Sequence, residues 1–236
     1  CNSQNDYHLE LEYVTMAKEN QVDGILSITY SDIAPYVADA NIPMVAIERY
    51  FNSRIPFVST DNFQGGVMAA KKLRELGCRK LAFVGRLSDE NGVTKLRRDG
   101  FVSYCCENDI PYAELYSSSG SQEFIREIDH FVKQEFQDGT PLDGVFAAAD
   151  RYAEYLMDSL QAYNCPAIAG DTLQIIGFDG IKSHANDRIR ISSMAQPVEE
   201  IAAYAVDTLC RQIAGEEVEH YKLFPVTFIQ GKTTRL

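Results

Sequence analysis

Short apolar runs alternate with helical patterns along the whole of this sequence. The runs are rich in Val, Ile, Leu, Phe and Ala and have the length of buried strands, whereas the segments between them carry apolar residues at helical spacing. Strands that alternate with helices in this way form parallel sheets through right-handed crossovers. The sequence therefore predicts an α/β protein with doubly wound parallel sheets. Five of the runs occupy residues 25–28, 43–47, 81–84, 143–147 and 173–179.

Residues 71–101 contain one complete helix–strand unit, followed by an arginine beyond the carboxyl end of the strand. An amphipathic helix ends at Gly77, a buried-strand run follows at residues 81–84, and Arg97 stands at the start of the next helical pattern. Open α/β sheets bind ligands beyond the carboxyl ends of their strands. Arg97 is therefore a candidate ligand-binding residue, with a solvated helix arginine as the alternative.

Three short extended pieces, at residues 57–60, 191–196 and 223–226, can each carry the chain from one sheet to another. We therefore expect two lobes joined by three crossover segments. The last strand is predicted over residues 223–229 and a further helix over residues 31–40. The N-terminal lobe is expected to comprise residues 1–58 and 197–223, and the C-terminal lobe residues 59–196 and 224–236.

The chain is strongly acidic, with a net charge of −12 from 34 Asp and Glu against 22 Lys and Arg. Because nucleic-acid phosphates bind clustered Lys and Arg, any DNA-binding part is expected to lie outside this chain. No apolar run is long enough to span a membrane, and no signal segment is present. The six cysteines show no C-x-x-C pair and the four histidines no ligand spacing, which predicts reduced cytosolic thiols and no metal site.

Polar residues follow several of the predicted strands. Asp150 comes just after one run, where capping of the next helix and contact with a ligand are equally good interpretations. Asp179 ends another run at a place where no helix needs a cap, so a ligand contact is favoured. In the first lobe Thr29, Tyr30 and Glu48 end two strands and are expected at one rim.

Seven short motifs occur in a fixed order along the chain. They are VDGI (22–25), IPMV (42–45), VSTDN (58–62), LGCRKLAFVG (76–85), RRDGF (97–101), IGFD (176–179) and PVTF with TTR (225–235). Together they resemble the effector-binding region of the LacI/GalR family of bacterial transcription regulators, and the resemblance covers essentially the whole chain. Each motif alone is a weak signal, but seven motifs in the family's order are strong evidence.

The resemblance implies a two-lobed core of the periplasmic binding protein-like type I fold, which binds a small effector, commonly a sugar, between its lobes. In that family a helix-turn-helix domain and a hinge helix precede the core. The resemblance therefore implies that the DNA-reading head and the first βαβ part are absent from this sequence. It also implies a cytoplasmic homodimeric repressor that binds operator DNA through that head and couples effector binding to operator affinity.

The resemblance also implies roles for particular residues. Arg97 would donate forked hydrogen bonds to ligand hydroxyls, and Asp179 would accept from a pair of them, the two facing each other across a gap between the lobes. Asp150 takes the position of the family's "ND" turn, but Ala149 replaces the amide, which removes one expected hydrogen bond to the ligand. Gln196 is a further candidate. Truncation of Arg97 or Asp179 is expected to abolish effector binding and to leave thermal unfolding nearly unchanged.

Three other classes of protein compete with this interpretation. A sugar-binding protein of a transport system has the same fold, but it would be exported and monomeric, and the TTR ending, the unpaired cysteines and the missing signal disfavour it. A lipoprotein with Cys1 as its lipid-bearing residue would normally carry a tether, whereas here a helical pattern follows at once. An enzyme is disfavoured because the sequence has no nucleophile elbow, phosphate loop or metal spacing, so no catalytic residue and no cofactor is predicted.

Overall fold

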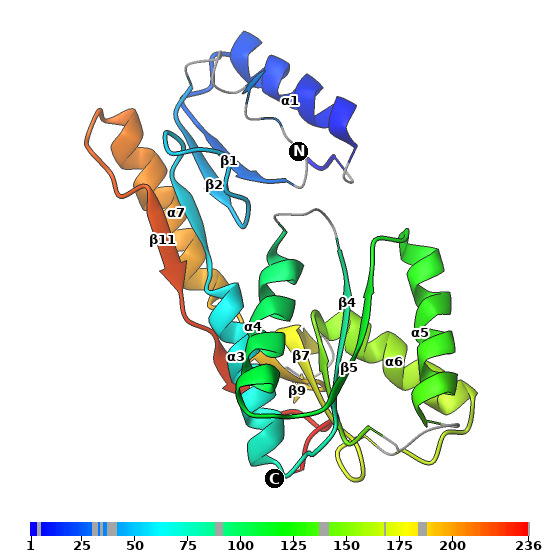
Figure 1. The fold of residues 1–236 in the computed structure, drawn as a ribbon. Helices are drawn as coiled ribbons and strands as arrows, with labels where there is room; N and C mark the ends of the chain where they lie inside the picture. The colour runs from blue at the N-terminus through cyan, green and yellow to red at the C-terminus, as the bar shows by residue number, and fades with distance from the viewer. Residues whose placement is uncertain are drawn as a thin grey trace. The chain divides into compact units, whose positions relative to one another are not determined.

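A computed structural model describes residues 1–3, 6–29, 33, 35–36, 42–87, 92–136, 142–167, 169–183 and 188–235 (Figure 1). The chain forms two compact units and passes from one to the other three times. The first unit comprises Cys1–Thr60 and Pro197–Phe224, and the second comprises Asp61–Gln196 and Pro225–Leu236.

The first unit is built on a parallel sheet whose strands lie in the order β1, β2, β3, β11. Alternate residues of β2 point to opposite faces of this sheet. Ala46 belongs to one buried cluster, against which Val14 of helix α1 packs, and Val45 belongs to another with Ile201 and Ala205 of helix α7. The elements are α1 (Tyr7–Glu19), β1 (Ile25–Ile28), β2 (Met44–Ile47), β3 (Phe57–Thr60), α7 (Val198–Ile213) and β11 (Tyr221–Phe224).

The second unit is built on a sheet with the strand order β12, β10, β7, β6, β4, β5. Its neighbouring strands run parallel, except that β12 is antiparallel to β10. A short antiparallel pair, β8 (Lys182–Ser183) and β9 (Arg188–Ile189), follows β7. The other strands are β4 (Leu81–Arg86), β5 (Tyr112–Ser117), β6 (Gly144–Ala147), β7 (Gln174–Asp179), β10 (Ser192–Ala195) and β12 (Thr227–Ile229). The helices are α3 (Asn62–Glu75), α4 (Val93–Glu107), α5 (Ser121–Phe136) and α6 (Asp150–Ala162).

Helices cover both faces of this second sheet (Figure 1). Val84 of β4 belongs to a buried cluster with Phe124 of α5, whereas its neighbour Phe83 belongs to the opposite cluster, with Leu73 of α3 and Phe101 of α4. Because adjacent strand residues point to opposite faces, α5 and α6 cover one face and α3 and α4 the other. The doubly wound α/β architecture predicted from the alternation of strands and helices is confirmed.

Helices α3 and α4 pack with their backbones in contact at two glycines. A Cβ atom on Gly100 of α4 would overlap the backbone carbonyl oxygen of Phe63, and a Cβ atom on Gly66 of α3 would overlap that of Arg97. Only glycine allows this approach. The contact places the helical turn that carries Arg97 directly against the first turns of α3.

The prediction of one final strand over residues 223–229 is wrong. The structure has two strands there, β11 in the sheet of the first unit and β12 in that of the second, and the chain changes unit between Phe224 and Pro225. The pair β8 and β9 was not predicted. The helix expected over residues 31–40 lies largely outside the described residues.

Candidate functional site

Four of the predicted site residues belong to the second unit and follow the carboxyl ends of its strands. Arg97 lies on α4, which follows β4, and Asp150 is the first residue of α6, which follows β6. Asp179 ends β7, and Gln196 follows β10. The order of strands reverses between β4 and β6, because β5 lies on one side of β4 and β6 on the other. A reversal of this kind is where open α/β sheets bind ligands.

The guanidinium group of Arg97 is buried and held on several sides. Its Nε donates to Oδ1 of Asn62 at 2.8 Å, and its Nη1 donates to the carbonyl oxygen of Ala148 at 2.7 Å. Nη1 also lies 3.7 Å from Oδ1 of Asp179, and the group sits over the ring of Phe178 at 3.6 Å from the ring centroid. Arg97 is only 4% exposed, so its donors are oriented in advance.

Asp179 is the more accessible member of this ion pair, with 30% of its side chain exposed. Its Oδ1 accepts a hydrogen bond from Nε2 of Gln196 at 2.9 Å. Burial raises the pKa of Asp179, and the charge of Arg97 and the hydrogen bond from Gln196 only partly oppose this rise. The sequence-based picture placed Arg97 and Asp179 on opposite sides of a gap. In the structure both belong to one unit and contact each other, so no ligand fits between them.

Asp150 binds the turn that follows Asp179. Its Oδ2 accepts from the backbone N–H groups of Gly180, at 3.0 Å, and Ile181, at 2.7 Å. The carboxylate does not cap its own helix, because Ala149 is the N-cap residue of α6 and makes no side-chain capping bond. Burial raises the pKa of Asp150 to about 6; the charge of Asp179 adds to this rise, and the backbone hydrogen bonds oppose it.

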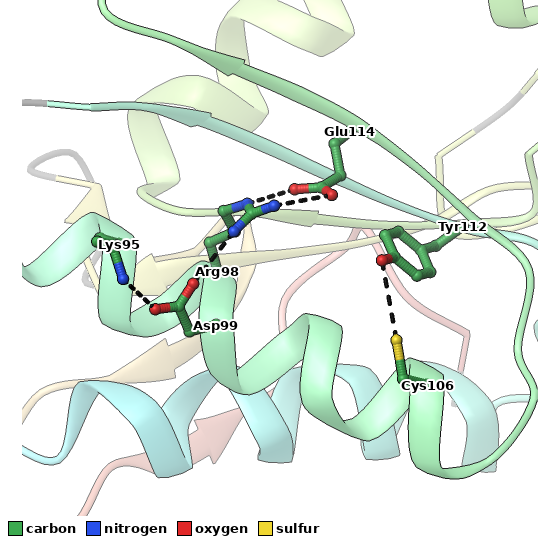
Figure 2. Close-up of polar contacts among 6 residues, drawn as sticks. All are labelled: Lys95, Arg98, Asp99, Cys106, Tyr112 and Glu114. Carbon is green, nitrogen blue, oxygen red and sulfur yellow. Dashed lines mark hydrogen bonds and ion pairs between the residues drawn. The ribbon is translucent and has the colours of Figure 1, made fainter.

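Arg98, the next residue of α4, serves a different network, which Figure 2 shows. Its Nε and Nη2 donate to the carboxylate of Glu114 on β5, and its Nη1 donates to Asp99 at 3.1 Å. Lys95 donates to the other oxygen of Asp99 at 2.5 Å. Arg98 is 29% exposed in this network of surface charges, so two adjacent arginines have separate tasks.

The remaining candidates belong to the first unit. Thr29 is 4% exposed and donates its hydroxyl hydrogen to Glu10 of α1, so it is bound within that unit. Thr29 and Glu10 both contribute to the lining of a cavity of about 470 Å³ beside β1. Glu48 follows β2 with a φ of 65°. Tyr30 lies outside the described residues.

Two residues around Arg97 were missed by sequence reasoning. Asn62 and Phe178 were named only as members of two motifs. In the structure Asn62 accepts a hydrogen bond from the guanidinium group, and the ring of Phe178 stacks against it. Their motifs, VSTDN and IGFD, were recognised, but which side chain each would meet depends on contacts far apart in the sequence. No local pattern reports those contacts.

Three negative findings apply to the part of the chain that the structure describes. It contains no group of three or more His, Cys, Asp or Glu placed to hold a metal ion. No helix among these residues is long and apolar enough to cross a lipid bilayer. All six cysteines occur as free thiols.

Comparison with known proteins defines the class of this chain. Residues 70–234 match the family model of the periplasmic binding protein-like domain. The sucrose operon repressor of Streptococcus mutans is 32% identical over 99% of this chain and 70% of that protein. The ribose operon repressor of Halalkalibacterium halodurans is 29% identical over 100% of this chain and 69% of that protein.

A solved structure agrees with these sequence matches. It is a periplasmic binding protein/LacI transcriptional regulator from Alkaliphilus metalliredigens, complexed with D-xylulofuranose. It superimposes with a TM-score of 0.81 at 27% identity, over 99% of this chain and 86% of that chain. The fold and the matches therefore define a periplasmic binding protein-like domain. The chain belongs to the LacI/GalR family of transcription regulators and corresponds to the effector-binding domain, which confirms the family predicted from the seven motifs.

Proposed function

We propose that this chain is the effector-sensing core of a cytoplasmic bacterial transcriptional repressor. It binds a small sugar or sugar derivative and thereby changes the affinity of the repressor for operator DNA. The observation that carries this proposal is the 32% identity to an operon repressor over 99% of the chain. The chain is a sensor and not an enzyme. A sugar-binding protein of a transport system is disfavoured because the matched relatives are operon repressors.

The chemistry of the site suits a polyhydroxylated ligand. A sugar presents neighbouring hydroxyl groups, each of which can donate one hydrogen bond and accept others. The exposed side of Asp179 accepts from such hydroxyls, and Arg97 and Gln196 supply oriented N–H donors beside it. The proposed contacts in the second unit are therefore Arg97, Asp179 and Gln196. From the first unit, Thr29, Glu48 and Tyr30 remain candidates.

The proposed mechanism uses the two units as the two lobes of a sensor. The chain passes between them three times, so each lobe is assembled from segments far apart in sequence. An effector that binds one arrangement of the lobes more tightly than another shifts the population toward that arrangement. A coupling of about 1–3 kcal/mol would change operator affinity by about 5- to 150-fold.

The proposed repressor acts as a homodimer, since paired DNA-reading heads bind two half-sites. The first unit exposes several apolar side chains on and near α7, and exposed apolar surface of this kind suits self-association. These side chains are Val198, Val206, Ile213 and Tyr221, with exposed fractions of 62%, 48%, 45% and 55%. Segment 31–40, where the sequence predicts a helix, and helix α3 are further candidates for the dimer face.

A sugar-dependent rise in thermal stability tests the proposal. We expect one member of a panel of sucrose, ribose, D-xylulose and their phosphates to raise the melting temperature by about 5–10 °C at 100 times its Kd, because a ligand that binds only the folded state stabilises it by about 2.7 kcal/mol. Differential scanning fluorimetry and isothermal titration measure the shift and the Kd.

Asp179→Asn is the matched control, because it removes the acceptor charge and keeps the shape of the side chain. Its melting temperature is expected to stay the same with and without the sugar. In the full-length gene product, the same sugar should change the affinity for operator DNA. A panel in which no sugar shifts the wild-type protein contradicts the proposed ligand class.

A further inference from the structure

We propose that Asp150 is a positioning residue, which holds Asp179 in the backbone conformation that presents its carboxylate to the ligand and does not contact the ligand itself. This role rests on the proposed function of the site. It differs from both sequence interpretations of Asp150, the helix cap and the direct ligand contact.

The backbone around Asp179 requires something to hold it. Asp179 has a φ of 112°, a value that side-chain-bearing residues rarely adopt, and Gly180 follows with a φ of 79°. Strained conformations of this kind persist only where the surroundings fix them. Asp150 does so through the two residues that follow Asp179, because one oxygen of its carboxylate accepts the N–H groups of both Gly180 and Ile181. The clamp therefore acts on the turn that sets the direction of the Asp179 side chain.

The surroundings of Asp150 leave no room for a ligand. The residue is 3% exposed, and its Oδ1 is buried without a hydrogen bond from any described residue. A Cβ atom on Gly177 of β7 would overlap this oxygen. One carboxylate oxygen is thus occupied by the turn and the other lies against the backbone of β7. The glycine of the IGFD motif is explained by the same contact.

Burial of the ionised Asp150 carboxylate lowers the stability of the folded protein. A group that is kept at such a cost is more readily explained by a functional role. Asp179 faces it from β7 with a like charge and adds to the rise in its pKa, whereas the Ser193 hydroxyl of β10, which accepts from the N–H of Gly180 at 3.0 Å, opposes that rise. The folded-state pKa of about 6 lies above the ordinary value of 3.8, so the ionised form is disfavoured in the folded protein. As the pH falls from about 6 toward 4, the folded state gains a proton that the unfolded state lacks, and stability from this group rises. Asp150→Asn is therefore expected to melt at a higher temperature than the wild type at pH 7.5.

Asp143 provides a matched control within the same unit. Its carboxylate accepts the backbone N–H groups of Arg79, at 2.8 and 2.7 Å, and Lys80, at 2.9 Å. It therefore makes the same kind of clamp, but it precedes β6, whereas Asp150 follows that strand. Loss of this second clamp should affect the local turn without affecting Asp179.

Nuclear magnetic resonance of the backbone amides tests the clamp without any ligand. In the wild type, the amide signals of Gly180 and Ile181 are expected to titrate together with a midpoint near pH 6, as the accepting carboxylate gains its proton. In Asp150→Asn this titration should disappear, and in Asp143→Asn it should remain. Signals that do not titrate, or that titrate equally in Asp150→Asn, overturn the proposal.

Sugar binding tests the consequence for function. With sucrose or ribose as the probe, Asp150→Ala and Gly177→Ala should each raise the Kd at least tenfold, and Asp143→Asn should leave it unchanged within twofold. Wild-type affinity in a folded Asp150→Ala protein overturns the positioning role. If the wild type binds no sugar of the panel, the proposed function fails, and the amide titration still decides whether Asp150 fixes the turn.

Discussion

Replacement of Gly100 by alanine is expected to destabilise the second unit by about 3 kcal/mol or more. The added Cβ would overlap the carbonyl oxygen of Phe63 and would lie 2.9 Å from its carbonyl carbon and 3.1 Å from the backbone nitrogen of Val67. These are backbone atoms of α3, so no side chain can rotate away, and the two helices must separate. Overpacking of a core costs about 1–3 kcal/mol when side chains can move, so a clash with backbone lies at or above that range.

Thermal and urea unfolding measure this effect, as a fall in melting temperature of about 6–12 °C for a domain of this size. Gly66→Ala, which places its Cβ against the carbonyl oxygen of Arg97, should give a similar loss from the opposite helix. Gly120→Ala is the control, since nothing lies within 4 Å of its Cβ position. A Gly100→Ala protein within 0.5 kcal/mol of the wild type would mean that α3 and α4 separate easily.

This close approach of helices illustrates what the sequence could and could not predict. A helix was predicted here from its apolar spacing, but with its start at Arg97, whereas α4 begins at Val93 after Gly92, which makes no side-chain capping bond. The glycine within RRDGF was recognised only as part of a motif. Its physical reason is a contact with residues about 35 positions earlier in the chain, at the first turns of α3. Periodicity gives the elements, but it does not report which helices touch.

The final strand was mispredicted for a related reason. Residues 223–229 form one nearly continuous apolar run, and a local reading makes one strand of it. In the structure Tyr221–Phe224 pairs with β3 in one sheet, and Thr227–Ile229 pairs with β10 in the other. Pro225, which cannot donate a backbone hydrogen bond, was the one local sign of a break. The choice of sheet depends on long-range pairing.

The candidate site was predictable in its residue types and not in its contacts. Arg97 and Asp179 were expected near the carboxyl ends of strands, and both lie there. That expectation depends only on topology. The burial of Arg97 follows from Asn62 of α3, from the backbone carbonyl of Ala148 just after β6, and from the ring of Phe178 on β7. Asp150 shows the limit most clearly, since a carboxylate at a helix start looks like a cap, whereas here it binds a turn 30 residues later.

Replacement of Arg97 by methionine is expected to weaken sugar binding at least 100-fold and also to destabilise the protein. Hydrogen bonds to a charged group contribute about 1.5–3 kcal/mol each, so loss of two corresponds to a factor of 100 or more. The structure replaces the expectation that thermal unfolding stays nearly unchanged, because Arg97 is 4% exposed and donates hydrogen bonds to Asn62 and Ala148. Removal of one member of a buried pair costs about 3–5 kcal/mol, and the partial exposure of Asp179 favours the lower end.

Arg98→Met separates the role of this site from that of an arginine on the same helix. Arg98 also binds carboxylates, but it is 29% exposed, and an exposed ion pair is worth about 0–1 kcal/mol. Arg98→Met should therefore lower stability slightly and leave the Kd for the sugar unchanged in isothermal titration. Equal losses of affinity in the two variants would show that helix α4 acts only as a scaffold. A large loss in Arg97→Met, together with a folded Asp179→Asn that also fails to bind, assigns ligand recognition to the Arg97–Asp179 pair, because Asp179→Asn removes the negative charge and one acceptor oxygen and leaves Arg97 unchanged.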